Sequence, residues 1–125
     1  MTENEIAKIV VDCSFKIHTT IGPGLLESVY EEILNKELNK RGLETERQKA
    51  MPVIYEGLKM ELGFRADIIV ENKVILELKS LEILAPVHSK QLLTYLRISG
   101  MKLGLLINFG EALIKNGIHR IVNNL

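Results

Sequence analysis

Three charged residues, Asp67, Glu77 and Lys79, stand in an otherwise apolar stretch of the sequence. Two carboxylates could hold a divalent cation, because Mg²⁺ prefers oxygen ligands and usually keeps several waters. The cation would acidify a bound water, and the ammonium group of Lys79 could orient that water or stabilise the hydroxide. The alternative is an Asp–Lys–Glu ion pair with a purely structural role, since such networks imitate functional sites. The pattern alone leaves both interpretations open.

Two predicted strands carry these residues. Leu58 to Val70 and Val74 to Lys79 are rich in branched apolar residues, and the polar segment Glu71-Asn72-Lys73 between them predicts a tight hairpin turn. If the residues that flank the turn pair with each other, Asp67 lies opposite Glu77. We therefore expect the two acids to meet across the hairpin.

Side chains alternate between the two faces of a strand, so Asp67, Glu77 and Lys79 are expected on one face. Charges within such apolar strands are costly unless they are paired or bound to a metal. The cluster is therefore more informative than three charges on an exposed surface would be.

The rest of the chain shows alternating helical and extended periodicities that position this hairpin. Pro52 predicts that the first strand lies at a sheet edge or carries a bulge, and Gly42 is placed to end a helix. The predicted helices are Glu3–Thr19, Gly24–Arg41 and His88–Ser99, and the further extended segments are Ala50–Tyr55, Leu103–Phe109 and a short strand or helix at Ile118–Val122, with Leu81–Pro86 as a connection.

Composition limits the kind of protein. The chain has 125 residues, 46% of them hydrophobic, which predicts a single domain over residues 1–125. Sixteen basic and sixteen acidic residues cancel, so any surface that binds nucleic acid must be local. Cys13 is the only cysteine, which fits a cytoplasmic location, and no apolar segment approaches the ~20 residues that span a bilayer.

Three short motifs follow one another in the order Gly63-Phe64-Arg65-Ala66-Asp67, Glu77-Leu78-Lys79 and Gln91-Leu92-Leu93-Thr94-Tyr95. They resemble the G-h-x-x-D, E-h-K and Q-x-x-x-Y motifs (h for apolar) of RecB-like members of the PD-(D/E)XK nuclease superfamily. The segment Gly24-Leu25-Leu26-Glu27-Ser28-Val29-Tyr30 further resembles the signature of the small family called GxxExxY proteins. The similarity runs from about residue 9 to residue 122.

This resemblance implies a restriction-endonuclease-like α/β fold: an αβββαβ core with a mixed central sheet flanked by helices, here with an additional N-terminal helix. It also implies dependence on Mg²⁺ or Mn²⁺ and hydrolysis of phosphodiester bonds. Asp67 and Glu77 would be metal ligands, and Glu27 is carried over as a helical acid that meets the metal directly or through water. Lys79 and Gln91 would complete the catalytic set.

Further residues are candidates for contacts with substrate or for support of the site. Gln91 and Tyr95 are four apart on a predicted helix and could hold Lys79, a carboxylate or a phosphate, or make ordinary interhelical hydrogen bonds. His88 could bind Mn²⁺ or substrate, or be a partly exposed polar residue. Arg65 is two residues from Asp67 and is expected on the same face of the strand, where it could bind phosphate or pair with Glu77 or Glu61. Tyr30 lies on the same side of its helix as Glu27.

Three functional interpretations follow. The first is a metal-dependent nuclease that acts on nucleic acid, with DNA as the preferred substrate. The second is a catalytically silent binding or adaptor subunit that acts with a protein partner, which the neutral charge and small size favour. The third is a purely structural dimer or chaperone-like subunit. A homodimer is also compatible with the first, because duplex cleavage by a one-site domain usually needs two copies. None of them involves a membrane.

Overall fold

A computed structural model describes residues 1–125 of the chain. The element order is ααβββαβ followed by a 3-10 turn and a last strand. The helices are α1 (Glu3–Ile21), α2 (Glu27–Lys40) and α3 (Pro86–Ser99), the strands are β1 (Thr45–Tyr55), β2 (Leu58–Val70), β3 (Val74–Lys79), β4 (Leu103–Asn108) and β5 (Ile118–Val122), and η1 (Ile114–Asn116) is the 3-10 turn.

The five strands form one mixed sheet in the order β1-β2-β3-β4-β5. β3 and β4 run parallel, and every other neighbouring pair is antiparallel. The β2–β3 pairing joins Val70 to Val74, which confirms the predicted hairpin register. The predicted restriction-endonuclease-like α/β architecture is confirmed, and the tail, left open between strand and helix, is a strand.

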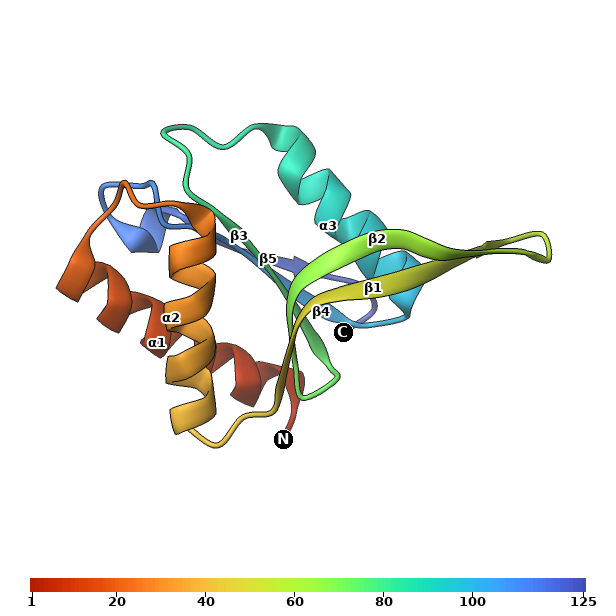
Figure 1. Cartoon of the computed structure of the whole chain (residues 1–125), viewed down its shortest axis with the longest axis horizontal. Coiled ribbons are helices and arrows are strands. Elements are labelled where there is room, and N and C mark those ends of the chain that lie inside the picture. The colour runs from red at the N-terminus through yellow and green to blue at the C-terminus, as the bar shows by residue number, and fades with distance from the viewer.

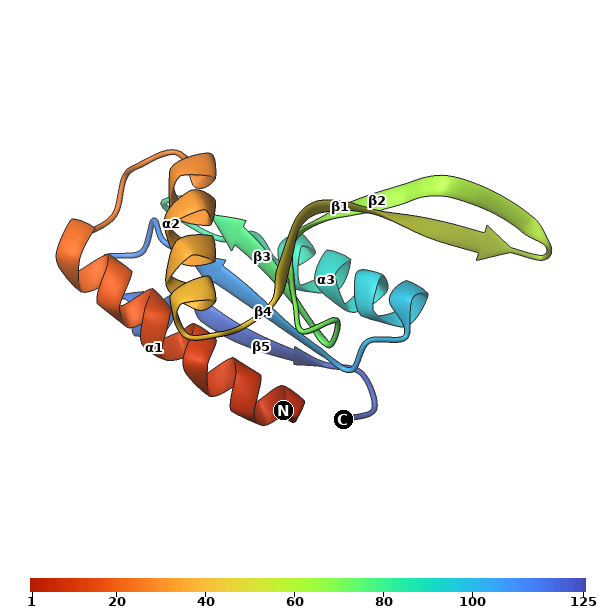
Figure 2. The ribbon, with the colours of Figure 1, turned by 60° about the horizontal axis from the view of Figure 1, so that its bottom comes forward.

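Helices cover both faces of the sheet (Figure 1). α1 and α2 lie on one face, where they bury the larger of two apolar clusters, while α3 covers the opposite face over the smaller cluster (Figure 2). The connection from β3 to β4 passes through α3, which is the crossover that a parallel pair requires. None of the three helices is long and apolar enough to cross a membrane.

The regular alternation of side chains along β2 breaks at Asp67. Phe64 and Ala66 belong to the cluster under α3, but Ile68 and Val70, which an unbroken alternation would put on the same side, belong to the cluster under α1 and α2. The opposing position in β1 is Gln48, whose φ of 48° lies in the left-handed region. The two strands therefore exchange faces at this point.

Some predicted boundaries were wrong. β1 begins at Thr45 rather than Ala50, because residues 45–49 pair with β2 although their sequence is polar. α3 begins at Pro86, since proline is well suited to the first turn of a helix. α2 begins at Glu27 rather than Gly24, whose φ of 105° is incompatible with a helix. Both predictions made from Pro52 are confirmed, because β1 is an edge strand and its register with β2 shifts at this residue.

The distal parts of β1 and β2 form a two-stranded arm, residues 53–62, that projects beyond the rest of the molecule (Figures 1 and 2). Its turn residues Glu56 and Gly57 both have positive φ, as a tight two-residue hairpin turn requires. Five large apolar side chains of the arm are 40% to 67% exposed: Ile54, Tyr55, Leu58, Met60 and Leu62. The arm thus offers an apolar surface that nothing in the chain covers.

Candidate active site

Asp67 and Glu77 meet where the β2–β3 ladder ends. Counting away from the turn, the last backbone pair of the two strands is Ile68 with Leu76, and Asp67 and Glu77 are the next residues on each strand. Beyond it side chains replace backbone partners: Asp67 Oδ2 accepts a hydrogen bond from the Leu78 amide at 2.8 Å, and Glu77 Oε1 accepts one from the Asp67 amide at 3.4 Å. The two carboxyl groups are thereby fixed beside each other.

The environment of this pair opposes full ionisation. Glu77 is only 7% exposed. Burial disfavours its charged form, the negative charge of Asp67 disfavours it further, and together they raise the pKa of Glu77 to about 9. A pKa in this range keeps Glu77 protonated at neutral pH, beside the carboxylate of Asp67. Such a pair is a donor set suited to a divalent cation, whose charge would remove the repulsion.

Lys79 ends β3 and, by alternation, lies on the same face as Glu77. Its positive charge lowers the pKa of Glu77, but this effect is smaller than the opposing effects of burial and of Asp67. The ammonium group takes part in none of the ion pairs of the chain. The structural Asp–Lys–Glu ion pair that the sequence left open does not form, so the ammonium group has no charge partner.

Two residues that the sequence analysis did not select, Gln48 and Glu31, contact this site. The Gln48 amide nitrogen donates to Asp67 Oδ1 at 3.1 Å and to Glu31 Oε1 at 2.6 Å. Glu31 is buried on α2, where it also pairs with Arg47 at 2.9 Å. An acid on the inward stripe that α2 forms with Leu34 was a signal that could have identified Glu31. Nothing in the sequence marks Gln48.

Comparison with known proteins decides the family. The family model described as the PD-(D/E)XK nuclease superfamily matches residues 4–121. The chain belongs to this superfamily. Among solved structures, the crystal structure of SSO0001 is similar, with a TM-score of 0.54 and 22% sequence identity over 79% of this chain and 51% of that one. This likeness shows the fold, and the chain spans about half the length of SSO0001. Among curated proteins, none matched the sequence.

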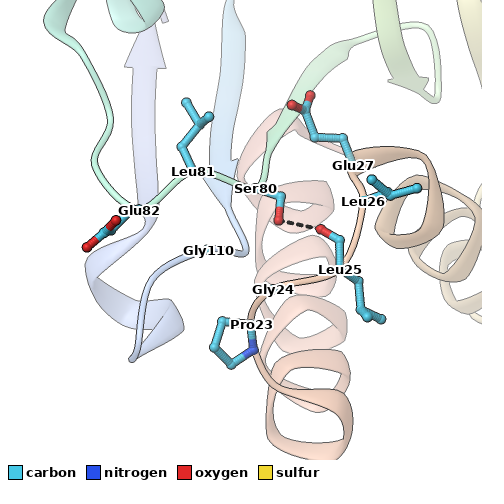
Figure 3. Close-up of a pocket in the computed structure, with 9 residues that line it drawn as sticks. All are labelled: Pro23, Gly24, Leu25, Leu26, Glu27, Ser80, Leu81, Glu82 and Gly110. Carbon is cyan, nitrogen blue, oxygen red and sulfur yellow. Dashed lines mark hydrogen bonds between the residues drawn. The ribbon is translucent and has the colours of Figure 1, made fainter.

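Glu27 is exposed at the first position of α2, the helix that packs against β3. It lies at the rim of a pocket of about 530 Å³ between the α1–α2 loop and the segment after β3 (Figure 3). Figure 3 shows Glu27 at the other end of the loop from Pro23, with its side chain pointing away from Pro23. No three acidic, histidine or cysteine side chains are arranged to hold a metal ion. The structure thus brings Asp67 and Glu77 together and leaves Glu27 apart from them.

The superfamily residues on α3 differ in their surroundings. Tyr95 stacks on Phe64 with ring centroids 3.9 Å apart. Burial raises the pKa of Tyr95, and the negative charges of Glu77 and Asp67 raise it further, so its hydroxyl lies within electrostatic range of the acid pair. Gln91, one turn earlier, is exposed and makes no hydrogen bond within the chain. Its amide is free to contact a ligand.

Three further candidates have local partners. Tyr30 is fully buried, so of its two predicted roles only support of the site remains. His88 Nδ1 accepts a hydrogen bond from the Ala85 amide at 3.2 Å and so caps α3. Arg65 is exposed and donates to the Gln48 carbonyl at 3.3 Å. The predicted ion pair of Arg65 with Glu77 or Glu61 does not form.

The expectation that Arg65 shares a face with Asp67 assumed an unbroken alternation along β2. The alternation breaks between Ala66 and Ile68, that is at Asp67 itself, so it does not place Arg65 beside Asp67. The loop at residues 22–24 is a turn into α2, and its Gly22 carbonyl accepts a hydrogen bond from the Tyr30 hydroxyl at 2.6 Å.

Proposed function

We propose that this chain is a Mg²⁺- or Mn²⁺-dependent nuclease that hydrolyses phosphodiester bonds of nucleic acid, with DNA as the first substrate to test. One observation carries the proposal: backbone amides hold the carboxyl groups of Asp67 and Glu77 beside each other, and the ammonium group of Lys79 has no ion-pair partner. Superfamily membership supports the same chemistry.

Asp67 and Glu77 would hold the metal. Bound Mg²⁺ or Mn²⁺ lowers the pKa of a water ligand and offsets negative charge on the phosphate. Glu77 must lose its proton to become a ligand, so binding of the metal should release protons in the pH range where Glu77 is otherwise neutral. Glu27 is proposed as a third acid that acts through water, because it is exposed on the helix that packs against β3.

Lys79 would orient the attacking water and stabilise the hydroxide by its positive charge. Gln91 would contact a substrate phosphate, because its amide is exposed and unpaired on α3. Tyr95, next to the acid pair, would support the site, and Arg65 would contact the backbone of the nucleic acid further along β2. His88 caps α3, and a contact with substrate is proposed only for its exposed edge.

A cleavage assay tests the proposal on supercoiled, single-stranded and branched DNA and on RNA, with Mg²⁺ or Mn²⁺. We expect Asp67→Asn, Glu77→Gln and Lys79→Met to lower the rate about 100-fold or more, as loss of preorganised charge does elsewhere. Lys59→Met is the matched control, because Lys59 is an exposed lysine on the arm. Wild-type protein that leaves all of these substrates intact with both metals would refute the nuclease proposal.

A second candidate is a binding or adaptor subunit that acts through protein contacts, and the exposed apolar arm favours it. Among protein contacts we propose a homodimer. Tyr55 pairs with Leu58 and Val53 with Met60, so these side chains line one face of the arm, which a second copy could cover with the same face. A dimer with no cleavage activity would favour the adaptor.

Two finer assignments complete the proposal. Membership of the GxxExxY family is proposed from the segment Gly24 to Tyr30, and the buried hydroxyl of Tyr30 gives that segment a reason to end in tyrosine. A single domain over residues 1–125 in the cytoplasm is proposed because all elements join one sheet and its two covering layers, and because Cys13 is a buried free thiol.

A further inference from the structure

Gln48 has a backbone conformation that its residue type does not favour. Its φ is 48° in the middle of β1, and a left-handed conformation of a residue other than glycine costs on the order of 1 kcal/mol. Such strain persists where the surrounding structure holds it, and it clusters at functional sites. The question is what the side chain of Gln48 gains in this position.

The side chain joins the acid pair to α2. Its amide nitrogen donates to Asp67 Oδ1 at 3.1 Å and to Glu31 Oε1 at 2.6 Å, which uses both hydrogens of the amide. Because the Leu78 amide holds Asp67 Oδ2, both oxygens of Asp67 have a fixed donor. The plane of the Asp67 carboxylate is thereby set by two separate elements, β3 and β1.

Glu31 is a rigid anchor for this contact. It is 7% exposed, and its Oε2 accepts a hydrogen bond from Arg47 Nε at 3.0 Å and forms an ion pair with Arg47 Nη2 at 2.9 Å. Arg47 in turn pairs with Glu32 at 2.7 Å. With Oε2 held by the guanidinium fork, Oε1 is directed to Gln48, so α2 transmits a fixed position to the Gln48 amide.

We propose that Gln48 and Glu31 are positioning residues that orient the Asp67 carboxylate for a divalent cation. The inference rests on the proposed function, since it assumes that Asp67 is a metal ligand. Hydrogen-bond partners behind a metal ligand fix its orientation, and their loss typically weakens metal affinity about 10- to 100-fold. The bridge also explains why β1 adopts a strained conformation directly opposite Asp67.

Gln48→Gly separates positioning from folding. Glycine adopts a φ of 48° without strain, so we expect the melting temperature of the metal-free protein to stay the same or rise. Mn²⁺ affinity, measured by calorimetry, should fall about 10-fold or more. Gln48→Asn should show the same loss, because asparagine tolerates the backbone but is one methylene shorter. Glu31→Gln should weaken Mn²⁺ binding by a smaller factor.

Glu56→Gly is the matched control. Glu56 also has a strained φ, 47°, but lies at the tip of the arm, so its replacement relieves strain without touching the site. It should bind Mn²⁺ like the wild type. If wild type binds Mn²⁺, Asp67→Asn does not, and Gln48→Gly equals wild type, the positioning role is refuted while the metal site stands. Tighter binding by Gln48→Gly also refutes it, because the amide would then compete with the cation. Absence of Mn²⁺ binding by the wild type overturns both the metal site and the inference.

Discussion

The carboxyl groups of Asp67 and Glu77 repel each other when both are ionised, and a proton on Glu77 removes this repulsion. Side-chain hydrogen bonds to backbone amides hold both acids at the end of the β2–β3 ladder. Since burial and the neighbouring charge raise the pKa of Glu77 to about 9, the proton is the ion that occupies the pair without metal. Under the proposed function, a divalent cation would replace it.

The raised pKa of Glu77 predicts how the stability of the folded chain depends on pH. Between the unfolded pKa of 4.5 and the folded value of about 9, the folded state holds a proton on Glu77 that the unfolded state lacks. The stabilisation is complete below the lower value and is lost as pH rises through this window. In chelator, we expect the melting temperature of the wild type to fall from pH 5 to pH 9 more steeply than that of Glu77→Gln.

The difference between the two proteins should reach at least about 2 kcal/mol, or roughly 6–10 °C for a chain of this size. Addition of Mn²⁺ at the alkaline end should raise the melting temperature of the wild type and leave Glu77→Gln unchanged. Parallel pH profiles for the two proteins would mean that Glu77 is already ionised in the folded chain.

A second prediction concerns Tyr30. Its ring stacks on Phe109 with centroids 4.5 Å apart, and its hydroxyl donates to the Gly22 carbonyl at 2.6 Å and accepts from the Leu25 amide at 3.2 Å. Tyr30→Phe keeps the stacking and removes both hydrogen bonds, which should cost about 1–2 kcal/mol in denaturant unfolding. Tyr55→Phe, on the exposed arm, is the control and should leave stability unchanged. An equal loss in both variants would contradict the role of the Tyr30 hydroxyl.

At the level of elements, the end of β4 positions the segment that follows Lys79. Asn108 is fully buried; its Oδ1 accepts hydrogen bonds from the amides of Leu81 and Gly110 at 2.9 and 3.1 Å, and its Nδ2 donates to the Leu81 carbonyl at 2.9 Å. The Asn108 side chain thus supplies hydrogen-bond partners to the backbone beyond the end of β3, where strand pairing has stopped.

Asn108→Ala would leave three backbone groups without these partners. We expect a loss of about 2–4 kcal/mol in the free energy of unfolding, measured in urea. Asn116→Ala is the control, because Asn116 is exposed and its side chain makes no hydrogen bond within the chain. A loss below 1 kcal/mol for Asn108→Ala would indicate that water replaces the amide.

Periodicity was sufficient for most elements, because their apolar residues follow the period of one helix face or one strand face. It was also sufficient for the β2–β3 register, since a short turn fixes the pairing of its flanks. It failed for residues 45–49 of β1, which are polar and join the sheet only because β2 offers them a free edge. Tertiary pairing overrode local preference there.

The site, like the fold, was predictable from the sequence only in part. The meeting of Asp67 and Glu77 followed from the hairpin, but the exchange of faces at Gln48 did not, because a left-handed residue within a strand leaves no mark in composition. Alternation therefore could not place Arg65 relative to Asp67. Glu31 was overlooked in favour of Glu27, although only Glu31 lies on the inward face of α2. Motif spacing identifies ligands in sequence, while their supports depend on the local backbone.

At the level of the whole molecule, the candidate active site and the apolar surface of the arm lie in different places. Asp67 lies on β2, and Glu77 and Lys79 lie on β3, within the sheet that the helices cover. The arm, residues 53–62, projects away from this body (Figure 2). The arm carries Glu56, Lys59 and Glu61, and Lys59 pairs with Glu61 at 3.6 Å. Without a surplus of positive charge, the arm is suited to a protein surface rather than to phosphates.

A second copy of the chain provides a matching apolar face, so we expect the wild type to be a dimer in light scattering. Leu58→Lys places a charge on this face, at a residue that is 62% exposed and supports no core, and should yield a folded monomer. Ile83→Lys is the matched control, because Ile83 is 80% exposed on the β3–α3 connection, and it should remain dimeric. If Leu58→Lys and Ile83→Lys both remain dimeric, the two copies associate elsewhere; a monomeric wild type would mean that the arm receives a different protein. Because the arm lies apart from the acid pair, the monomeric variant should also keep the Mn²⁺ affinity of the wild type.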